Sequence, residues 1–376
     1  MIKIAFMGIK GLPSRGGAER VVEPIVHELA GRQKLTVYCN IRYTPQGTNI
    51  DGVRLIRIPT LPGKYLQPVS FFILSALHAV FKGDYDLIHL HNVEACFILP
   101  LLRIRYRVIA TSHGSPIRAA RSKWGPLART LMGLTEYPYL LLPNCATSVS
   151  QSDAEYFKQL YRREVFYLPN GIQQHPVNPE IARQTLDEMG LRAGEYILFA
   201  AGRIDPTKGC HLVLDAFYQL NLNIRLVIVG DLSQVPHYSQ NLQQKADGRT
   251  VFIPHIAEKE KLFGIVRHCR LFVFPSLVEA MSMMLLEVAA LGVPLICSDI
   301  PENKDVLDKH ALYFRSGNTQ DLAQKMRWAL EHPDAMLSLA ARAQTRVKSV
   351  YSRERMVEEY ESLYLKIANL NPLEME

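Results

Sequence analysis

Short apolar runs rich in β-branched residues alternate with helix-like stretches along nearly the whole chain, and this alternation limits the folds open to it. In the first half the expected strands are 2–7, 34–39, 53–58, 86–91, 107–112 and 146–150. The stretches 19–30, 69–81, 126–136 and 151–161 have helical patterns. Because several strands are apolar without alternation, we expect both of their faces to be covered. The pattern predicts βαβ units around a parallel sheet.

A turn signal interrupts this alternation near the middle of the chain. Pro169-Asn170-Gly171 is followed by Pro176 and Pro179. A second series of expected strands then follows, at 196–201, 225–230, 250–253, 271–274 and 293–298. We therefore expect two Rossmann-like α/β lobes, 1–171 and 172–351, and a last helix within 352–376 that has one apolar face. Ligands bind beyond the carboxyl ends of the strands in such sheets, so two facing lobes would form a cleft.

The positive charge of the chain is concentrated in its first half. Residues 1–170 carry a net charge of +10 and the remaining residues a net charge of −3. This asymmetry predicts an anionic partner for the first lobe, such as an anionic membrane surface or a phosphorylated lipid carrier. The alternative is a basic surface that serves only solubility. A nucleic-acid partner is disfavoured, because the chain has no recognised binding motif and no dense Lys/Arg run with interleaved aromatic residues.

The cysteines and the apolar runs bear on location. Six scattered cysteines without a Cys-x-x-Cys pair argue against a zinc or redox motif and suit a reducing cytosol. No secretion signal is recognised, and the apolar run 69–81 is too short to span a bilayer. We expect a cytoplasmic protein, with peripheral attachment to the inner face of the membrane as a further expectation. The run 69–81 is expected to be one helix buried against its sheet.

The loop after the first strand is rich in glycine. Gly16-Gly17 lies where the following helix begins, and the free amides and dipole of a helix start favour an anion. The spacing matches neither a dinucleotide fingerprint nor a P-loop. The alternative is a tight strand-to-helix turn with no ligand.

Two cations follow the first strand of the second lobe, in Gly202-Arg203-Ile204-Asp205-Pro206-Thr207-Lys208-Gly209. A strand end would place Arg203 and Lys208 at the cleft, where a guanidinium fork and a compact ammonium group can bind phosphate oxygens. Both could stabilise a leaving diphosphate, whose negative charge grows as the glycosidic bond breaks. The alternative is two solvated surface cations.

Two glutamates lie at a later junction of a strand and a helix, Pro275 to Glu287. We expect Glu279 in the loop and Glu287 on the helix. The helix start near Ser282 and Met283 would present amides to a phosphate. Capping alone can also explain a carboxylate at a helix start.

A histidine follows the strand 107–112. His113 would lie at the carboxyl end of that strand and therefore in the cleft. A single histidine can equally be a structural residue with satisfied hydrogen bonds.

Taken in order, several short motifs resemble those of the retaining family 4 glycosyltransferases of GT-B fold. They are Gly16-Gly17-Ala18-Glu19, His113-Gly114, Pro169-Asn170-Gly171, Gly202-Arg203, Lys208-Gly209 and the pair Glu279 and Glu287. The resemblance runs over nearly the whole chain. The stretch from His113-Gly114 to Arg121-Ser122-Lys123-Trp124-Gly125 is similar to rhamnosyltransferase-like members of bacterial surface-polysaccharide pathways.

The resemblance implies a role for each motif and a helix 352–376 that crosses back to the first lobe. Arg203 and Lys208 would contact the donor diphosphate, Glu279 the hydroxyls of the donor sugar and Glu287 the ribose. Gly16 and Gly17 would approach the donor phosphates and the acceptor, and His113 the donor sugar near the reacting carbon. Such enzymes usually need no metal and have no resident cofactor, because basic side chains and helix amides take the place of a metal.

The sequence departs from the family pattern after the first glutamate. Family members commonly have Gly-Phe-Gly-Leu-Pro where this chain has Ala280-Met281-Ser282-Met283-Met284. Ser282 thus replaces a glycine that lets the backbone approach the diphosphate, although a serine still offers its amide and adds a hydroxyl. This departure casts some doubt on the expected geometry of the loop, and less on the expected reaction.

We expect a retaining glycosyltransferase that moves a sugar from a nucleoside-diphosphate sugar to a hydroxyl acceptor, a glycan or a lipid-linked glycan. The alternatives are an epimerase or hydrolase of sugar nucleotides on the same scaffold, or a non-enzymatic protein that binds anionic surfaces. For membrane attachment we expect Arg118, Arg121 and Lys123 of the first lobe to contribute.

Overall fold

The structure is a computed structural model of residues 1–376, and it describes all of them except 15, 64, 119–132, 174–175, 221–222 and 370–376. The chain forms two compact units. Unit 1 comprises Met1–Gly171 and Arg353–Glu376, and unit 2 comprises Ile172–Ser352.

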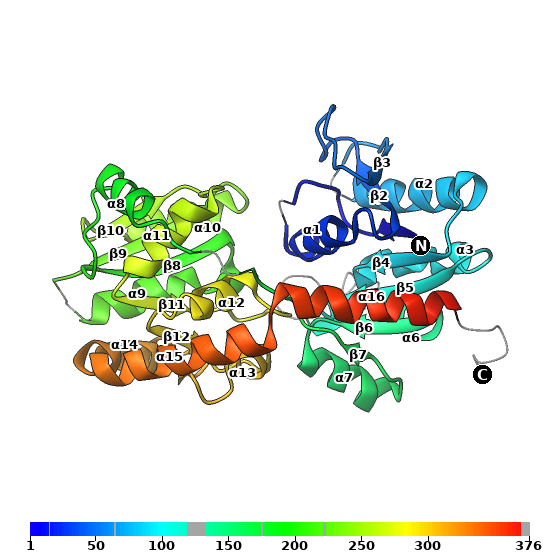
Figure 1. Ribbon diagram of the computed structural model, residues 1–376. Coiled ribbons are helices and arrows are strands. Elements are labelled where there is room, and N and C mark those ends of the chain that lie inside the picture. Colours follow the sequence, from blue (N-terminus) through cyan, green and yellow to red (C-terminus); the bar gives the residue numbers. More distant parts are fainter. Residues whose placement is uncertain (15, 64, 119–132, 174–175, 221–222, 370–376) are drawn as a thin grey trace. The chain divides into compact units, whose positions relative to one another are not determined.

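Unit 1 is built on a seven-stranded sheet of order β3-β2-β1-β4-β5-β6-β7, in which every pairing is parallel (Figure 1). Its strands are β1 (Lys3–Met7), β2 (Lys34–Asn40), β3 (Val53–Ile58), β4 (Leu87–His91), β5 (Arg107–Ser112), β6 (Cys145–Ser148) and β7 (Phe166–Tyr167). Its described helices are α1 (Gly17–Leu29), α2 (Leu66–Lys82), η1 (Val93–Ile98), α3 (Leu99–Leu102), α6 (Glu136–Leu141), α7 (Gln151–Tyr161) and α16 (Arg353–Asn369).

Helices cover both faces of this sheet because successive strand residues point to opposite sides. On β1, Ala5 and Met7 belong to a core with α2, η1 and α3, whereas Ile4 and Phe6 belong to a core with α1 and α16. The expected apolar face of the last helix is buried in the second of these cores, through Met356, Val357, Tyr360, Tyr364 and Ile367.

Unit 2 has a six-stranded sheet of order β10-β9-β8-β11-β12-β13, again with parallel pairings. The strands are β8 (Tyr196–Arg203), β9 (Arg225–Asp231), β10 (Thr250–Ile253), β11 (Leu271–Phe274), β12 (Leu295–Ser298) and β13 (Leu312–Phe314). The described helices are α8 (Pro179–Glu188), η2 (Pro206–Lys208), α9 (Cys210–Leu220), α10 (Pro236–Lys245), α11 (Lys259–His268), α12 (Met283–Ala290), α13 (Pro301–Leu307), α14 (Thr319–Glu331) and α15 (Pro333–Val350). The prediction of parallel α/β sheets is confirmed in both units.

The helix expected over 69–81 forms as α2, but the expectation that it is buried is wrong for its outer face. Toward the core α2 places mainly small residues, Ser75, Ala76 and Ala79, together with Phe71. Its larger apolar residues point outward instead: Leu66, Val69, Ile73, Leu74 and Phe81 are exposed. The run is apolar on all sides, so packing one face on the sheet leaves an apolar face uncovered. None of the described helices is both long enough and apolar enough to cross a bilayer.

Candidate active site

The glycine-rich loop of unit 1 is held by a carboxylate on the helix that follows it. The amide of Lys10 donates to Glu19 Oε1 at 2.9 Å. A Cβ atom on Gly16, which caps α1, would lie 2.3 Å from Glu19 Oε2. A Cβ atom on Gly17, the first residue of α1, would meet nothing within 4 Å. A side chain at position 16 would therefore meet the Glu19 carboxylate, whereas Gly17 has open space beside it at the start of the helix.

The residue that follows β5, His113, pairs with a second histidine. His91 Nδ1, at the end of β4, lies 3.0 Å from His113 Nε2, and the two rings are stacked with centroids 5.3 Å apart. His113 is only partly buried as a residue, and burial of its ring lowers its pKa to about 4. The imidazole is therefore uncharged at neutral pH, so His113 can act as a neutral donor or acceptor.

A third histidine extends this arrangement into the core. His89 Nδ1 lies 2.7 Å from the Tyr364 hydroxyl of α16, and His89 Nε2 lies 2.6 Å from Thr111 Oγ1 of β5. Burial lowers the pKa of both His89 and His91 well below the usual value. Strand β4 and the residue that follows β5 thus carry three uncharged histidines, of which His89 and His91 are fully buried.

Buried carboxylates fix the loop that follows His113. The Ser115 amide donates to Asp153 Oδ2 at 2.9 Å, and the Ser115 hydroxyl donates to Glu136 Oε1 at 2.6 Å. Arg118 forms an ion pair with the same Asp153. Burial raises the pKa of Glu136. Residues 121–125, which carry the rhamnosyltransferase-like part of the resemblance, lie outside the described residues.

In unit 2, the two expected phosphate-binding cations differ in setting. Arg203 is the last residue of β8 rather than part of the loop, and its side chain is exposed. Lys208, at the end of η2, donates to Glu279 Oε1 at 2.6 Å. The two loops approach closely because Gly209 has a φ of +70°, and a Cβ atom there would lie 2.2 Å from the Pro275 carbonyl oxygen. Lys208 and Glu279, which the sequence suggested as two separate candidates, are therefore in direct contact.

The second glutamate lies on α12, as expected. Ser282 caps this helix, and its hydroxyl accepts a hydrogen bond from the Leu285 amide at 3.4 Å. Met283 is the first helical residue, so its amide is among those that an α-helix leaves without an intrahelical acceptor. Glu287 is almost fully buried, and Lys259 Nζ of α11 lies 3.2 Å from its Oε1.

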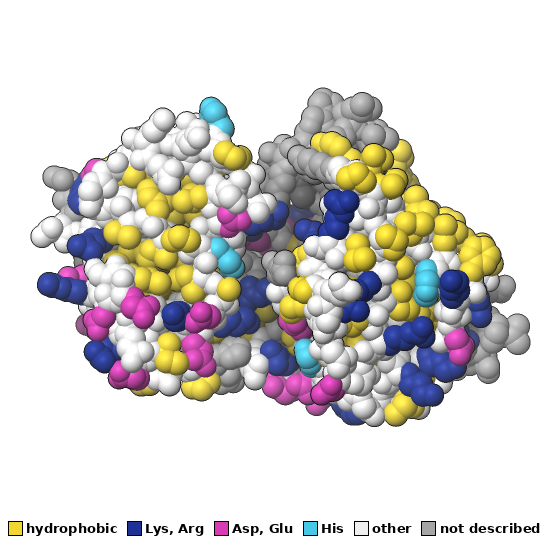
Figure 2. Space-filling model, turned by 90° about the horizontal axis from the view of Figure 1, so that it is seen from above, with side chains coloured by type: hydrophobic (Ala, Val, Ile, Leu, Met, Phe, Trp, Pro, Cys, Tyr) yellow, Lys and Arg dark blue, Asp and Glu magenta, His cyan; other side chains and the backbone are white. Residues whose placement is uncertain are grey.

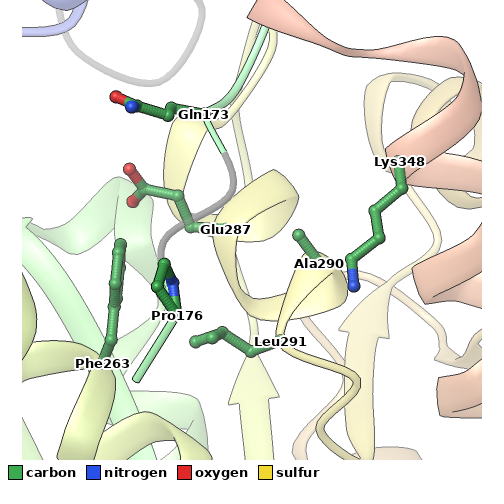
Figure 3. Close-up of a pocket in the computed structure, with 7 residues that line it drawn as sticks. All are labelled: Gln173, Pro176, Phe263, Glu287, Ala290, Leu291 and Lys348. Carbon is green, nitrogen blue, oxygen red and sulfur yellow. The ribbon is translucent and has the colours of Figure 1, made fainter. Parts of the chain in front are cut away.

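A cavity of about 210 Å³ adjoins Glu287 (Figure 3). It is smaller than a site for a drug-sized ligand and matches a single ring better than a whole nucleotide. Its apolar wall includes the Phe263 ring, and Lys348 of α15 supplies a cation. The lining residues are Gln173, Pro176, Phe263, Glu287, Ala290, Leu291 and Lys348.

Within the described residues, no cluster of three or more His, Cys, Asp or Glu side chains is placed to hold a metal ion. The sequence does contain one Asp-x-Asp triplet, Asp84-Tyr85-Asp86, directly before β4. Both of its carboxylates bind Lys3, since Lys3 Nζ donates to Asp84 and the Lys3 amide donates to Asp86. The triplet therefore serves the amino end of the sheet, opposite the edge where ligands bind.

Sequence reasoning missed three residues that shape these sites: His91, Lys259 and Glu136. A signal for His91 was present, since His89-Leu90-His91 ends a strand beside the strand that precedes His113. Lys259 and Glu136 have no comparable signal, because each meets its partner only through the tertiary fold.

Two family models match consecutive parts of the chain. Residues 15–174 match the model described as Glycosyltransferase Family 4, and residues 183–346 match the one described as Glycosyl transferases group 1. The chain belongs to glycosyltransferase family 4. The resemblance seen in the sequence is thereby confirmed, and the protein is a nucleotide-sugar-dependent glycosyltransferase.

Relatives of this glycosyltransferase include enzymes named for O-antigen biosynthesis and for capsular polysaccharide biosynthesis in bacteria. A UDP-Gal:α-D-GlcNAc-diphosphoundecaprenol α-1,3-galactosyltransferase of Escherichia coli is 25% identical over 271 residues, which cover 67% of this chain and 68% of the relative. The D-rhamnosyltransferase WbpZ of Pseudomonas aeruginosa is 26% identical over 198 residues, 51% of each chain.

Solved structures share the GT-B fold. Sucrose-phosphate synthase from Thermosynechococcus elongatus matches with a TM-score of 0.83 at 20% identity, covering 98% of this chain and 99% of that one. HepE from Anabaena, in complex with UDP and glucose, matches with a TM-score of 0.80 at 16% identity, covering 97% of this chain and 100% of that one.

Proposed function

We propose that this glycosyltransferase transfers a sugar from a UDP-sugar to a hydroxyl of a lipid-linked glycan, with retention at the anomeric carbon. The observation that carries the proposal is the 2.6 Å pair of Lys208 and Glu279. It puts a cation suited to a diphosphate beside a carboxylate suited to sugar hydroxyls. The name of the E. coli relative and the ligands of HepE support a UDP-sugar as the first donor to test.

Unit 2 binds the donor in this proposal. Arg203, Lys208 and the amides at the start of α12, near Ser282 and Met283, bind the diphosphate. Glu279 accepts hydrogen bonds from hydroxyls of the donor sugar. Glu287 accepts them from the ribose, and the adjoining cavity has room for one ring.

Unit 1 contributes His113, Gly16 and Gly17. His113 hydrogen-bonds the donor sugar near the reacting carbon as an uncharged imidazole. The open space beside Gly17 admits phosphate or acceptor atoms to the start of α1. Glycines at this place let a ligand approach the backbone closely.

The reaction proceeds by attack on the face from which the diphosphate leaves. The bond between the anomeric carbon and the phosphate oxygen breaks, and the acceptor oxygen forms the new bond to that carbon. A phosphate oxygen of the departing UDP takes the acceptor's hydroxyl proton. Arg203 and Lys208 stabilise the negative charge that develops on the diphosphate. No metal is required, since these cations and the amides of α12 supply positive charge.

Product analysis tests this proposal. UDP-sugars are incubated with a lipid-diphosphate-linked acceptor glycan, and NMR reads the configuration of the new linkage. We expect transfer with the donor's anomeric configuration retained. Inversion would contradict the same-face mechanism. Release of free monosaccharide without any acceptor would favour a hydrolase, and an epimerised donor would favour an epimerase.

We also propose that the protein works at the cytoplasmic face of a membrane and that unit 1 binds anionic lipid. The exposed face of α2 supports this, with Phe81 76% exposed and Ile104 of the neighbouring loop 75% exposed. Figure 2 shows hydrophobic side chains gathered on unit 1, with Lys and Arg side chains among and beside them. Lys82 ends α2, and Arg105 donates to the Val80 carbonyl at 2.6 Å.

The six free, buried cysteines suit the reducing cytoplasm.

This surface differs from the one that the sequence suggested. Arg118 is held by Asp153, and residues 121 and 123 lie outside the described residues. Each cation near an anionic leaflet contributes about 1 kcal/mol, and apolar side chains add to that as they leave water.

Co-sedimentation with phosphatidylglycerol vesicles, at low and high salt, tests the membrane proposal. We expect salt-sensitive binding that falls in Ile73→Ser/Phe81→Ser and in Lys82→Gln/Arg105→Gln. Leu337→Ser removes a comparably exposed leucine from α15 and should bind like wild type. If neither Ile73→Ser/Phe81→Ser nor Lys82→Gln/Arg105→Gln reduces vesicle binding, or if wild type does not bind at low salt, the proposal that the exposed face of α2 binds the membrane is overturned.

A further inference from the structure

The contact between His91 and His113 restricts where the proton can lie on each imidazole ring. His91 is fully buried, and its Nδ1 lies 3.0 Å from His113 Nε2. Burial keeps both imidazoles uncharged at neutral pH, so each ring has one N–H and one bare nitrogen. One nitrogen of the pair must donate and the other must accept. The two tautomers are therefore coupled.

The surroundings of His91 favour one of the two arrangements. Within the described residues, His91 Nε2 is buried and has no hydrogen-bond partner. If His113 donated to His91, the proton of His91 would lie on Nε2 as a buried N–H without an acceptor. Such groups are rarer in folded proteins than buried acceptors without a donor. His91 therefore carries its proton on Nδ1 and donates it to His113 Nε2.

The ring of His91 has little freedom to leave this arrangement. It stacks on Phe6 of β1, with ring centroids 6.2 Å apart and planes 15° apart. On another side it contacts His89, with centroids 3.9 Å apart. His89 is in turn held at both ring nitrogens, by Tyr364 and Thr111. The pairing of His91 with His113 is thus supported by packing from β1, β5 and α16.

We propose that His91 is a positioning residue that fixes the orientation and tautomer of His113. Because His113 Nε2 accepts from His91, His113 carries its own proton on Nδ1, the nitrogen turned away from His91. That N–H is presented to a ligand as a hydrogen-bond donor and suits a sugar oxygen or the oxygen of the breaking bond. Without His91, the proton of His113 redistributes between its two nitrogens, and the ring can turn. The inference rests on the proposed role of His113 in transfer.

Nitrogen NMR of the histidine side chains tests the tautomer directly, with no need of activity. The imidazole signals of His113 are assigned by their loss in His113→Gln. In the ligand-free protein we expect His113 to be protonated on Nδ1 and His91 on Nδ1, at pH 7.5. A His113 protonated on Nε2 would overturn the proposal, whether or not the protein transfers sugar.

Kinetics test whether His91 acts through His113. His91→Leu should lower kcat at least tenfold with less than a threefold change in the KM for the donor. His91→Asn, whose side-chain amide can place an N–H near the position of Nδ1, should recover most of that loss. In the His113→Gln background, His91→Leu should cause no further loss. His268→Leu removes a half-buried histidine with one ring-nitrogen partner from α11, and should leave kcat unchanged.

A purely structural role for His91 predicts a different result. His91→Leu would then lower kcat by the same factor with or without His113, and that additivity would overturn the proposal. Thermal unfolding shows that the variants compared are folded at the assay temperature. If His91→Leu does not fold, the tautomer of His113 measured in the wild-type protein decides between the two roles.

Discussion

The two units hold their candidate site residues in opposite electrostatic settings. In unit 2, the two candidate carboxylates are paired with cations: Glu279 with Lys208 and Glu287 with Lys259. In unit 1, the corresponding groups are uncharged, since His113 and His91 have pKa values lowered by burial. Charged pairs suit the binding of a nucleoside diphosphate, and a neutral donor suits contact with a sugar. In the proposed mechanism, unit 2 therefore sets the affinity for the donor, and unit 1 contributes to turnover.

The largest effect is expected at Glu279, because this carboxylate pairs with Lys208 and is also proposed to contact the donor sugar. Glu279→Gln keeps the size of the side chain but loses the charge that pairs with Lys208 and the proposed contact to the donor sugar. Hydrogen bonds to charged groups contribute about 1.5–3 kcal/mol each, so kcat should fall by about 100-fold. UDP affinity should change by less than threefold. Steady-state kinetics and calorimetric titration with UDP measure the two quantities. A loss of UDP affinity as large as the loss in kcat would break the division of roles.

The second effect concerns the nucleoside. Glu287→Gln should weaken UDP binding about tenfold, because the ribose loses a charge-assisted hydrogen bond. The change also removes the ionic partner of Lys259. Lys259→Met is therefore the matched control, and UDP binding in it should exceed that of Glu287→Gln. Equal losses in the two variants would assign the effect to the ion pair rather than to the ribose.

The next effect is a pH dependence of stability to which the buried histidines of unit 1 contribute. The folded-state pKa of His113 is about 4, below the unfolded value near 6.5, and those of His89 and His91 are also lowered. The unfolded chain therefore binds more protons as the pH falls below about 6.5, and the folded state loses stability from there down to about pH 4. The thermal midpoint should fall between pH 7 and pH 5. The fall should be smaller in His113→Gln, and an equal fall in this variant would exclude His113 as a source.

The smallest effects are expected at the two glycines of unit 1, and they should differ in kind. Gly17→Ala places a methyl group in open space and favours the helix by about 0.5–1 kcal/mol, so the thermal midpoint should hold or rise. Transfer should still slow several-fold if a ligand uses that space. In Gly16→Ala the methyl group meets Glu19, so the midpoint should fall. Wild-type kinetics in Gly17→Ala would contradict the proposal that a ligand approaches the start of α1.

The sequence predicted the parts of the fold that depend on local pattern. The strands over 53–58, 107–112, 250–253 and 271–274 appear with the expected bounds. For β11 the reason is plain, because a fully buried strand of a parallel sheet reads as an uninterrupted apolar run. The strands β7 and β13 were not expected, since two or three residues are too few to show a pattern.

The sequence could suggest the residues of the candidate site, but it could not predict which of them contact one another. Lys208 and Glu279 could each be suggested from a loop at a strand end, but their 2.6 Å contact depends on how two loops pack. The outward apolar face of α2 could not be expected either. A helix that is apolar on all sides gives no sign of which side the sheet will cover.

Titration calorimetry with UDP alone tests the central claim most directly, namely that the loops of unit 2 bind the donor diphosphate. The account predicts that Arg203→Ala and Lys208→Ala each weaken UDP binding at least tenfold, since each removes a charge-assisted hydrogen bond of about 1.5–3 kcal/mol. It also predicts that His113→Gln binds UDP like wild type. Wild-type affinity in both Arg203→Ala and Lys208→Ala would contradict the account, as would a loss in His113→Gln equal to theirs.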